Sequence, residues 1–172
     1  MNKVYFKHIL RFILLVALQL FFFNRIALWG MITPVVYIIF IFSLPFQTPR
    51  WLVILLGFAI GLTIDLFEGV IGLHALATLV MAFVRPMIIQ IIPFKLEREE
   101  HLQPVFYDMK PRWYIQYAIC MTLIHHIVFF FADVLSLHNF LRTLLVIFGN
   151  TLCSLACILL IQILFYKPSK RY

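Results

Sequence analysis

The sequence predicts an all-α integral membrane protein with six transmembrane helices. Its 172 residues are 64% hydrophobic and only 12% charged, whereas a soluble domain is about half apolar and one quarter charged. Six apolar runs follow one another, and they are apolar on every side rather than alternating as in a membrane β-barrel. Since about 20 helical residues cross the hydrocarbon layer, these runs account for nearly the whole chain. We therefore expect one polytopic membrane domain over residues 1–172, without a soluble catalytic domain.

The apolar runs place the six helices. They are expected at about 9–28, 31–46, 51–67, 70–92, 113–135 and 140–166. Pro34 stands near the start of the second run, and Pro45 closes it. The first run is too long for a cleaved signal peptide and lacks the small residues of a cleavage site, so it should remain as a membrane anchor. Residues 93–112 contain three prolines and should form the one extended polar loop.

Lysine and arginine predict the orientation, because cytoplasmic loops carry an excess of them. An even number of spans puts both chain ends on one side of the membrane. With twelve of the fourteen basic residues assigned to that side, only Arg25 and Arg142 lie opposite. Both termini are therefore expected to be cytoplasmic, in a multi-pass protein of the cell inner membrane. The net charge of +7 then reflects topology and attraction to anionic lipids, and a nucleic acid partner has no support.

The third run carries an acid where hydrocarbon would surround it. Gly57, Gly61 and Asp65 are spaced by four, so they share one helix face on which another backbone can approach closely. This face is expected to pack against a helix, either within the chain or in a partner. Counting residues from the membrane surface places Asp65 toward the outer leaflet and Arg85 near the cytoplasmic interface, where Arg85 can snorkel. The expected partners of Asp65 are therefore those at its own depth, namely Asn24, Arg25 and His74.

Further polar residues lie inside the last two runs. His125 and His126 sit near the middle of the fifth run, and Asn150 and Ser154 share a face of the sixth. Adjacent helical residues point about 100° apart, so the two imidazole rings cannot easily clasp one metal ion. We expect one histidine to bond Asn150 or Ser154, and the other to face the bundle or an interface. The three cysteines show no framework spacing and are expected to remain free.

No catalytic motif is apparent. A nucleophile with a base, a metal-binding helix such as HExxH, or a phosphate-binding glycine loop would indicate an enzyme, and none is found in the sequence. The acids of the outer side, Asp65, Glu68 and Asp133, are the nearest approach to a cluster, but the last two stand near helix ends, where acids are ordinarily solvated. We therefore expect a protein that is not an enzyme and that needs no cofactor or metal.

The third and fourth runs also carry a family resemblance. The order Gly57-Phe58-x-x-Gly61-Leu62-x-x-Asp65 is followed by Gly72-Leu73-His74-Ala75-Leu76-Ala77 and by Ala82-Phe83-Val84-Arg85-Pro86. This arrangement resembles the rod shape-determining protein MreD family, and the Arg85-Pro86 ending with the His125-His126 pair resembles its Bacteroidota type. The family often has proline immediately before the glycine of the Gly-Leu-His turn, where this chain has Ile71. The departure affects the conformation expected for the outer hairpin and leaves the family resemblance unchanged.

The resemblance implies a non-enzymatic membrane component of the cell-elongation machinery. Such a protein binds the MreC scaffold and acts with MreB, RodA and a class B penicillin-binding protein in peptidoglycan synthesis. Its fold would resemble the six-helix S component of energy-coupling-factor transporters. Helix-packing or partner contacts would then be made by Gly57, Gly61, Asp65, Gly72 and His74. The loop at 93–112 would be the natural cytoplasmic contact.

The alternative is a small-molecule carrier of that S-component type. It would need convergent polar groups on the outer side, and Asn24, Asp65 and His74 could supply a few. An S component typically docks its transporter through small residues spaced by four on its first helix. The first run here has Ala17 and Ala27 among bulky residues, so that spacing is missing. The sequence therefore favours the scaffold-binding function over the carrier.

Overall fold

The computed structural model describes residues 2–26, 31–70, 72–93, 103–134 and 140–165, and within them the protein is all-helical, without a β-strand. Five helices are long and apolar enough to cross a membrane. The prediction of an all-α membrane protein is thus confirmed. The elements are α1 (Asn2–Phe21), the 3-10 turn η1 (Phe23–Arg25), α2 (Ile39–Phe42), α3 (Arg50–Glu68), α4 (Leu73–Ile91), α5 (Pro111–Val134) and α6 (Phe140–Phe165).

Four of the predicted helices lie close to α3, α4, α5 and α6, but the first two differ. The helix α1 begins at Asn2, well before residue 9, and passes into η1 after Phe21. Its predicted end near residue 28 falls outside the described residues. The predicted second helix over 31–46 is wrong, because only Ile39–Phe42 is helical there.

The segment 31–49 departs from a helix for reasons that are local. Pro34 and Pro45 leave only residues 35–44 between them, which is far short of the roughly 20 that a membrane helix needs. A proline also disfavours helical backbone in the residue before it and removes an N–H donor. The intervening residues are rich in β-branched and aromatic side chains, which favour extended backbone. We call residues 31–49 the crossing segment.

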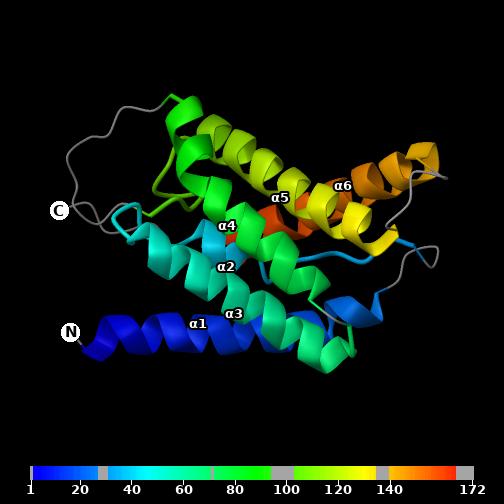
Figure 1. The fold of residues 1–172 in the computed structure, drawn as a ribbon. Helices are drawn as coiled ribbons and strands as arrows, with labels where there is room; N and C mark the ends of the chain where they lie inside the picture. Colours follow the sequence, from blue (N-terminus) through cyan, green and yellow to red (C-terminus); the bar gives the residue numbers. More distant parts are fainter. Residues whose placement is uncertain (1, 27–30, 71, 94–102, 135–139, 166–172) are drawn as a thin grey trace.

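The crossing segment runs through the middle of the bundle from one end to the other (Figure 1). Near its start the backbone nitrogen of Thr33 bonds Asn150 on α6. Near its end the carbonyl of Leu44 accepts a bond from Arg85 on α4. Every residue from 34 to 44 is buried. The segment thus occupies the middle of the bundle as an irregular chain, where the sequence predicted a second helix.

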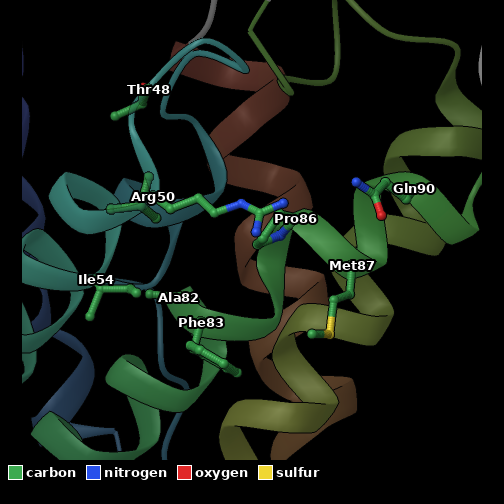
Figure 2. Close-up of a pocket in the computed structure, with 9 residues that line it drawn as sticks. Thr48, Arg50, Ile54, Ala82, Phe83, Pro86, Met87 and Gln90 are labelled. Carbon is green, nitrogen blue, oxygen red and sulfur yellow. The ribbon is translucent and has the colours of Figure 1, made fainter.

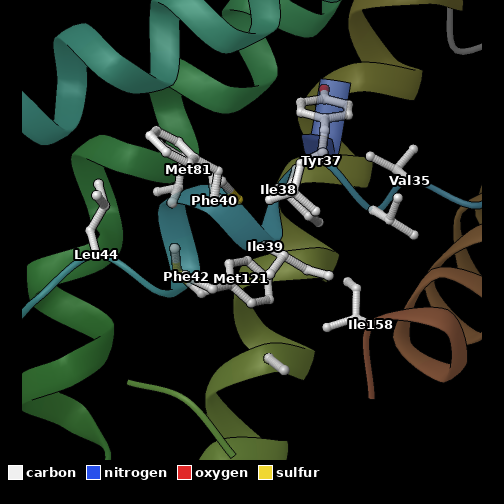
Figure 3. Close-up of a cluster of buried hydrophobic side chains, with 14 of the residues drawn as sticks. Val35, Tyr37, Ile38, Ile39, Phe40, Phe42, Leu44, Met81, Met121 and Ile158 are labelled. Atoms are coloured by element: carbon white, nitrogen blue, oxygen red, sulfur yellow. The ribbon is translucent and has the colours of Figure 1, made fainter. Parts of the chain in front are cut away.

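The hydrophobic core is built around this segment. Figure 3 shows Ile38, Ile39, Phe40 and Phe42 of the crossing segment among Met81 of α4, Met121 of α5 and Ile158 of α6. On the other side, the ring of Phe40 packs edge-on against Phe12 of α1, with 5.4 Å between the centroids. Irregular backbone is tolerated at membrane depth only where protein covers it, and the surrounding helices provide that cover.

The long helices form antiparallel neighbours around the segment. The pair α3 and α4 form a hairpin, and α5 and α6 form another. Trp113 at the start of α5 donates from Nε1 to the carbonyl of Ile92 at 3.0 Å, which ties α5 to the end of α4. Within the predicted 93–112 loop, Phe106 and Tyr107 lie against the end of α6, with Tyr107 Oη donating to the Ile163 carbonyl at 3.0 Å. Residues 94–102 of that loop lie outside the described part of the chain.

The start of α1 and the end of α6 lie at the same end of the bundle, which we call the basic end (Figure 1). The opposite end holds η1 and the α3–α4 turn, and we call it the acidic end. Among the described residues, the basic end holds Lys7, Arg11, Arg50, Arg85, Lys110 and Arg112. Arg25 and Arg142 lie toward the acidic end. This division matches the charge asymmetry used to predict the orientation.

Candidate functional site

The glycine face of α3 is covered by α4 of the same chain. A Cβ added to Gly57 would lie 2.9 Å from Ala82 Cβ, and one added to Gly61 would lie 2.5 Å from the carbonyl oxygen of His74. Real Cβ atoms are essentially never so close to another heavy atom. The two glycines therefore allow the backbones of α3 and α4 to touch. The predicted packing surface lies inside the hairpin rather than on its outside.

Asp65 is accommodated in the apolar run because its carboxylate caps the start of α4. Its carboxylate accepts the backbone N–H groups of His74 at 2.9 Å and Ala75 at 2.8 Å, and the residue is 1% exposed. A helix begins with unpaired N–H groups and a partial positive charge, both of which a carboxylate satisfies. His74, one of three predicted partners, is thus bonded through its backbone.

The turn between α3 and α4 depends on Gly72. This residue has φ of +74° and immediately precedes α4, a left-handed conformation that glycine adopts without steric cost. It sets the start of α4 so that the first N–H groups face Asp65. Gly72 therefore shapes the hairpin, and its neighbour Ile71 lies outside the described residues.

The His74 side chain begins a chain of hydrogen bonds that runs inward. Its Nε2 lies 3.0 Å from Glu68 Oε2, and its Nδ1 lies 2.9 Å from the hydroxyl of Tyr37. The same hydroxyl lies 2.9 Å from His125 Nε2. Glu68 is partly exposed, whereas Tyr37 and His125 are fully buried. The chain thus connects the acidic end of the bundle with the middle of α5.

The direction of the bonds in this chain depends on which ring nitrogens of His74 and His125 carry protons. An ionised Glu68 only accepts, so His74 Nε2 must carry the proton it donates. When His74 carries only that proton, its Nδ1 accepts from the Tyr37 hydroxyl, whose oxygen in turn accepts from His125 Nε2–H. His125 Nδ1 is left as a buried atom without a hydrogen-bond partner among the described residues. One hydroxyl therefore couples the protonation of the two histidines, because it donates to one ring and accepts from the other.

Gln19 of α1 holds the first part of the crossing segment. Its Oε1 accepts the Val36 N–H at 2.7 Å, while its Nε2 donates to the Pro34 carbonyl at 3.0 Å. The same Nε2 lies 2.7 Å from Oδ1 of Asn24, and Asn24 Nδ2 donates to Glu68 Oε1 at 2.5 Å. Asn24 therefore pairs with Glu68, and it links Gln19 to the Tyr37–His74 chain.

Two residues of α6 hold the crossing segment from the other side. Asn150 accepts the Thr33 N–H at 3.0 Å and donates to the Met31 carbonyl at 3.1 Å. Ser154 Oγ accepts the Val35 N–H at 2.8 Å. Both side chains are buried. The small polar face predicted on α6 thus satisfies a backbone that has no helical bonds of its own.

His126 contacts this same face of α6. Its Nδ1 lies 3.3 Å from Thr151 Oγ1, and its Nε2 lies 3.5 Å from Ser154 Oγ, which is long for a hydrogen bond. His125 points instead to Tyr37. The two adjacent rings therefore serve different neighbours, one on each side of α5.

Arg85 is buried and holds the end of the crossing segment. It is 3% exposed, bonds the Leu44 carbonyl, and donates from Nε to Tyr117 Oη at 3.1 Å. The expectation that Arg85 snorkels to the interface is wrong, because the irregular backbone offers a carbonyl that the guanidinium can reach inside the bundle. Its partners thus differ from those of Asp65, which bonds the start of α4.

Three important residues were not predicted: Gln19, Tyr37 and Gln162. Gln162 donates to Ser43 Oγ at 3.3 Å and lies beside Phe106 N. Both glutamines are amides inside apolar runs, so the rule that singled out Asn24 and Asn150 would have found them. Tyr37 had no such signal, because its run was interpreted as a helix.

The arrangement contains no metal centre in the part of the chain that the structure describes. No group of three His, Cys, Asp or Glu side chains is placed there to hold an ion. Its chemistry is hydrogen bonding: side chains from α1, α4 and α6 replace the bonds that a helix would have made. No known protein family, curated protein or solved structure matches the chain.

Proposed function

We propose that this protein is a non-enzymatic membrane component of a cell-elongation machinery and that it binds an MreC-like scaffold. MreB, RodA and a class B penicillin-binding protein would belong to the same assembly. The protein would lie in the cytoplasmic membrane with its basic end toward the cytoplasm, where a positive surface meets anionic lipids.

One observation carries the proposal: the residues of the MreD-like motif build a single structural unit. Gly57, Gly61 and Asp65 form the seam with the start of α4. The motif also contains residues that the hairpin leaves exposed, namely Phe58, Leu62 and Leu76. A motif made of a rigid seam and outward apolar side chains suits a protein that presents a helix surface to a partner.

The polar side chains at the acidic end are hydrogen-bonded within the bundle, which supports a scaffold-binding function over a small-molecule carrier. Asp65 bonds α4, His74 bonds Tyr37 and Glu68, and Asn24 bonds Gln19 and Glu68. A solute pocket at the acidic end would need these groups to be free. The same engagement argues against a reaction centre, because each of these side chains is bonded to a partner within the bundle.

The test is co-purification with an MreC-like protein. We expect the wild-type chain to retain that partner in detergent, and the double variant F58A/L62A to retain it at a small fraction of the wild-type level. The control is L145A/L152A, which shortens two apolar side chains on α6 that are more exposed than Phe58 and Leu62. Both variants should unfold at the wild-type temperature, since they alter exposed positions.

Two results would overturn the proposal. Wild-type protein that fails to retain the partner would remove the scaffold function. A small molecule that co-purifies in stoichiometric amount, as measured by mass spectrometry, would favour the carrier instead.

A further inference from the structure

A cavity opens between α3 and α4 at the basic end, at the opposite end of the hairpin from the Asp65 cap. Its volume is about 200 Å³, and its walls include Thr48, Arg50, Ala82, Phe83, Pro86 and Gln90 (Figure 2). This volume far exceeds the space of one water molecule, yet it is below the range of about 300–1,000 Å³ typical of whole small-molecule ligands. The cavity is therefore of a size for a small polar group.

The cavity has a cationic rim. The side chain of Arg50 reaches from the first turn of α3 across to Pro86 on α4 (Figure 2). No acidic side chain pairs with it within the described ranges. Thr48 and Gln90 add a hydroxyl and an amide to the same lining. An unpaired guanidinium with neighbouring donors is the chemistry that binds a phosphate group.

Pro86 adds an acceptor to this set of donors. Proline has no N–H, so Pro86 cannot make the helical bond to the carbonyl of Ala82, four residues earlier. Ala82 and Pro86 both line the cavity. A ligand that carries a hydroxyl beside its phosphate could donate to that carbonyl while Arg50 binds the phosphate.

The surroundings are apolar and face the membrane. Phe83 is 56% exposed and Met87 is 53% exposed, and both line the cavity. Acyl chains attached to a bound headgroup would lie along these side chains. The basic end also carries the exposed cations Lys110 and Arg112, which attract a negatively charged lipid surface.

We propose that this cavity binds the headgroup of an anionic phospholipid of the phosphatidylglycerol type, with Arg50 as the phosphate ligand. The cavity holds the phosphate and the hydroxylated headgroup, and the chains remain in the bilayer. The site lies between α3 and α4 at the basic end, and its lining does not include Phe58 or Leu62 of the proposed partner surface.

The experiment measures lipid binding to the purified full chain by native mass spectrometry. Phosphatidylglycerol and phosphatidylcholine with identical acyl chains are titrated separately. Both lipids offer a phosphate to Arg50, but phosphatidylcholine adds a quaternary ammonium, which a guanidinium repels and which cannot donate a hydrogen bond to the Ala82 carbonyl. We therefore expect the anionic lipid to bind more tightly by about tenfold or more. Arg50→Gln should remove this preference, and Met87→Trp, which fills the cavity without changing charge, should weaken phosphatidylglycerol binding.

The matched control is Arg112→Gln, which removes an exposed cation at the same end of the bundle but outside the cavity. It should alter the preference less than twofold. Equal binding of the two lipids by wild-type protein would overturn the proposal, as would equal effects of Arg112→Gln and Arg50→Gln, which indicate diffuse attraction. Competition by glycerol 3-phosphate or inorganic phosphate at concentrations equal to the lipid would assign the site to a soluble phosphate and overturn the lipid assignment.

Discussion

Oε1 of Gln19 accepts the backbone N–H of Val36 at 2.7 Å, and this bond joins the first membrane helix to a backbone that has left helical form. The same side chain donates to the Pro34 carbonyl. One amide therefore replaces both the donor and the acceptor of a missing helical turn. Comparable bonds from Asn150, Ser154 and Arg85 hold the rest of the crossing segment.

Replacing Gln19 should therefore destabilise the protein strongly. Gln19→Leu keeps the size of the side chain but leaves the Val36 N–H without its partner, at a cost of about 1 to 3 kcal/mol. The free energy of unfolding in detergent measures this effect. Gln116→Leu, at an exposed position on α5, should change it little. Equal stability of the two variants would contradict the assigned bonds.

The seam between α3 and α4 should reject a single methyl group at Gly61. The added Cβ of Gly61→Ala would meet the backbone of His74 and Ala75, which cannot move aside as a side chain could. We expect a loss of about 1 to 3 kcal/mol, as in other overpacked interiors. Gly149→Ala is the control, because its Cβ would meet only the flexible end of Ile32. Thermal unfolding should separate the two by several degrees.

Replacing Asp65 should lower the free energy of unfolding. Asp65→Ala removes both acceptors of the α4 N–H groups, and loss of such a cap costs about 0.5 to 2 kcal/mol. Asp65→Asn, which retains one oxygen acceptor, should lose less. Asp133→Ala, at an exposed site on α5, provides the reference. Unfolding curves that coincide for Asp65→Ala and Asp133→Ala would show that the cap carries no stability.

The Tyr37 hydroxyl should control the histidine tautomers. Tyr37→Phe retains the ring but removes the group between His74 and His125. We expect the nitrogen resonances of His125 to shift in histidine-labelled protein, because Nε2 loses its acceptor. Tyr107→Phe removes a hydroxyl at an exposed site and should leave those resonances unchanged. An unshifted His125 signal in Tyr37→Phe would break the proposed chain of bonds.

Much of the fold follows from local properties that a sequence displays. The helices α3 to α6 could be placed because continuous apolar runs of sufficient length have few alternatives in a membrane. The Gly57–Gly61–Asp65 face could be recognised as a packing surface because residues spaced by four share one side of a helix. Asp65 and Arg85 were expected at different depths, since rise per residue fixes position along a straight helix, and in the structure they bond different partners.

The crossing segment shows what local properties left open. Residues 35–44 are as apolar as any helix here, and hydropathy alone does not distinguish a buried irregular chain from a helix. The short spacing between Pro34 and Pro45 is a feature of the sequence that indicates an irregular chain rather than a membrane helix. The partners of its backbone could not be derived, because they come from α1, α4 and α6, remote in the chain.

The sequence by itself determined that this is a helical membrane protein, which residues are costly in hydrocarbon, and which helix face is small enough for close packing. Only the tertiary structure decided what those residues do. Asp65 caps α4, and Gly61 allows the backbone of α4 to pack against α3. Gln19, Asn150 and Arg85 bond the crossing segment. The reason is physical: the cost of burying a polar group depends on its own chemistry, whereas its compensation depends on which distant group the fold brings within 3 Å.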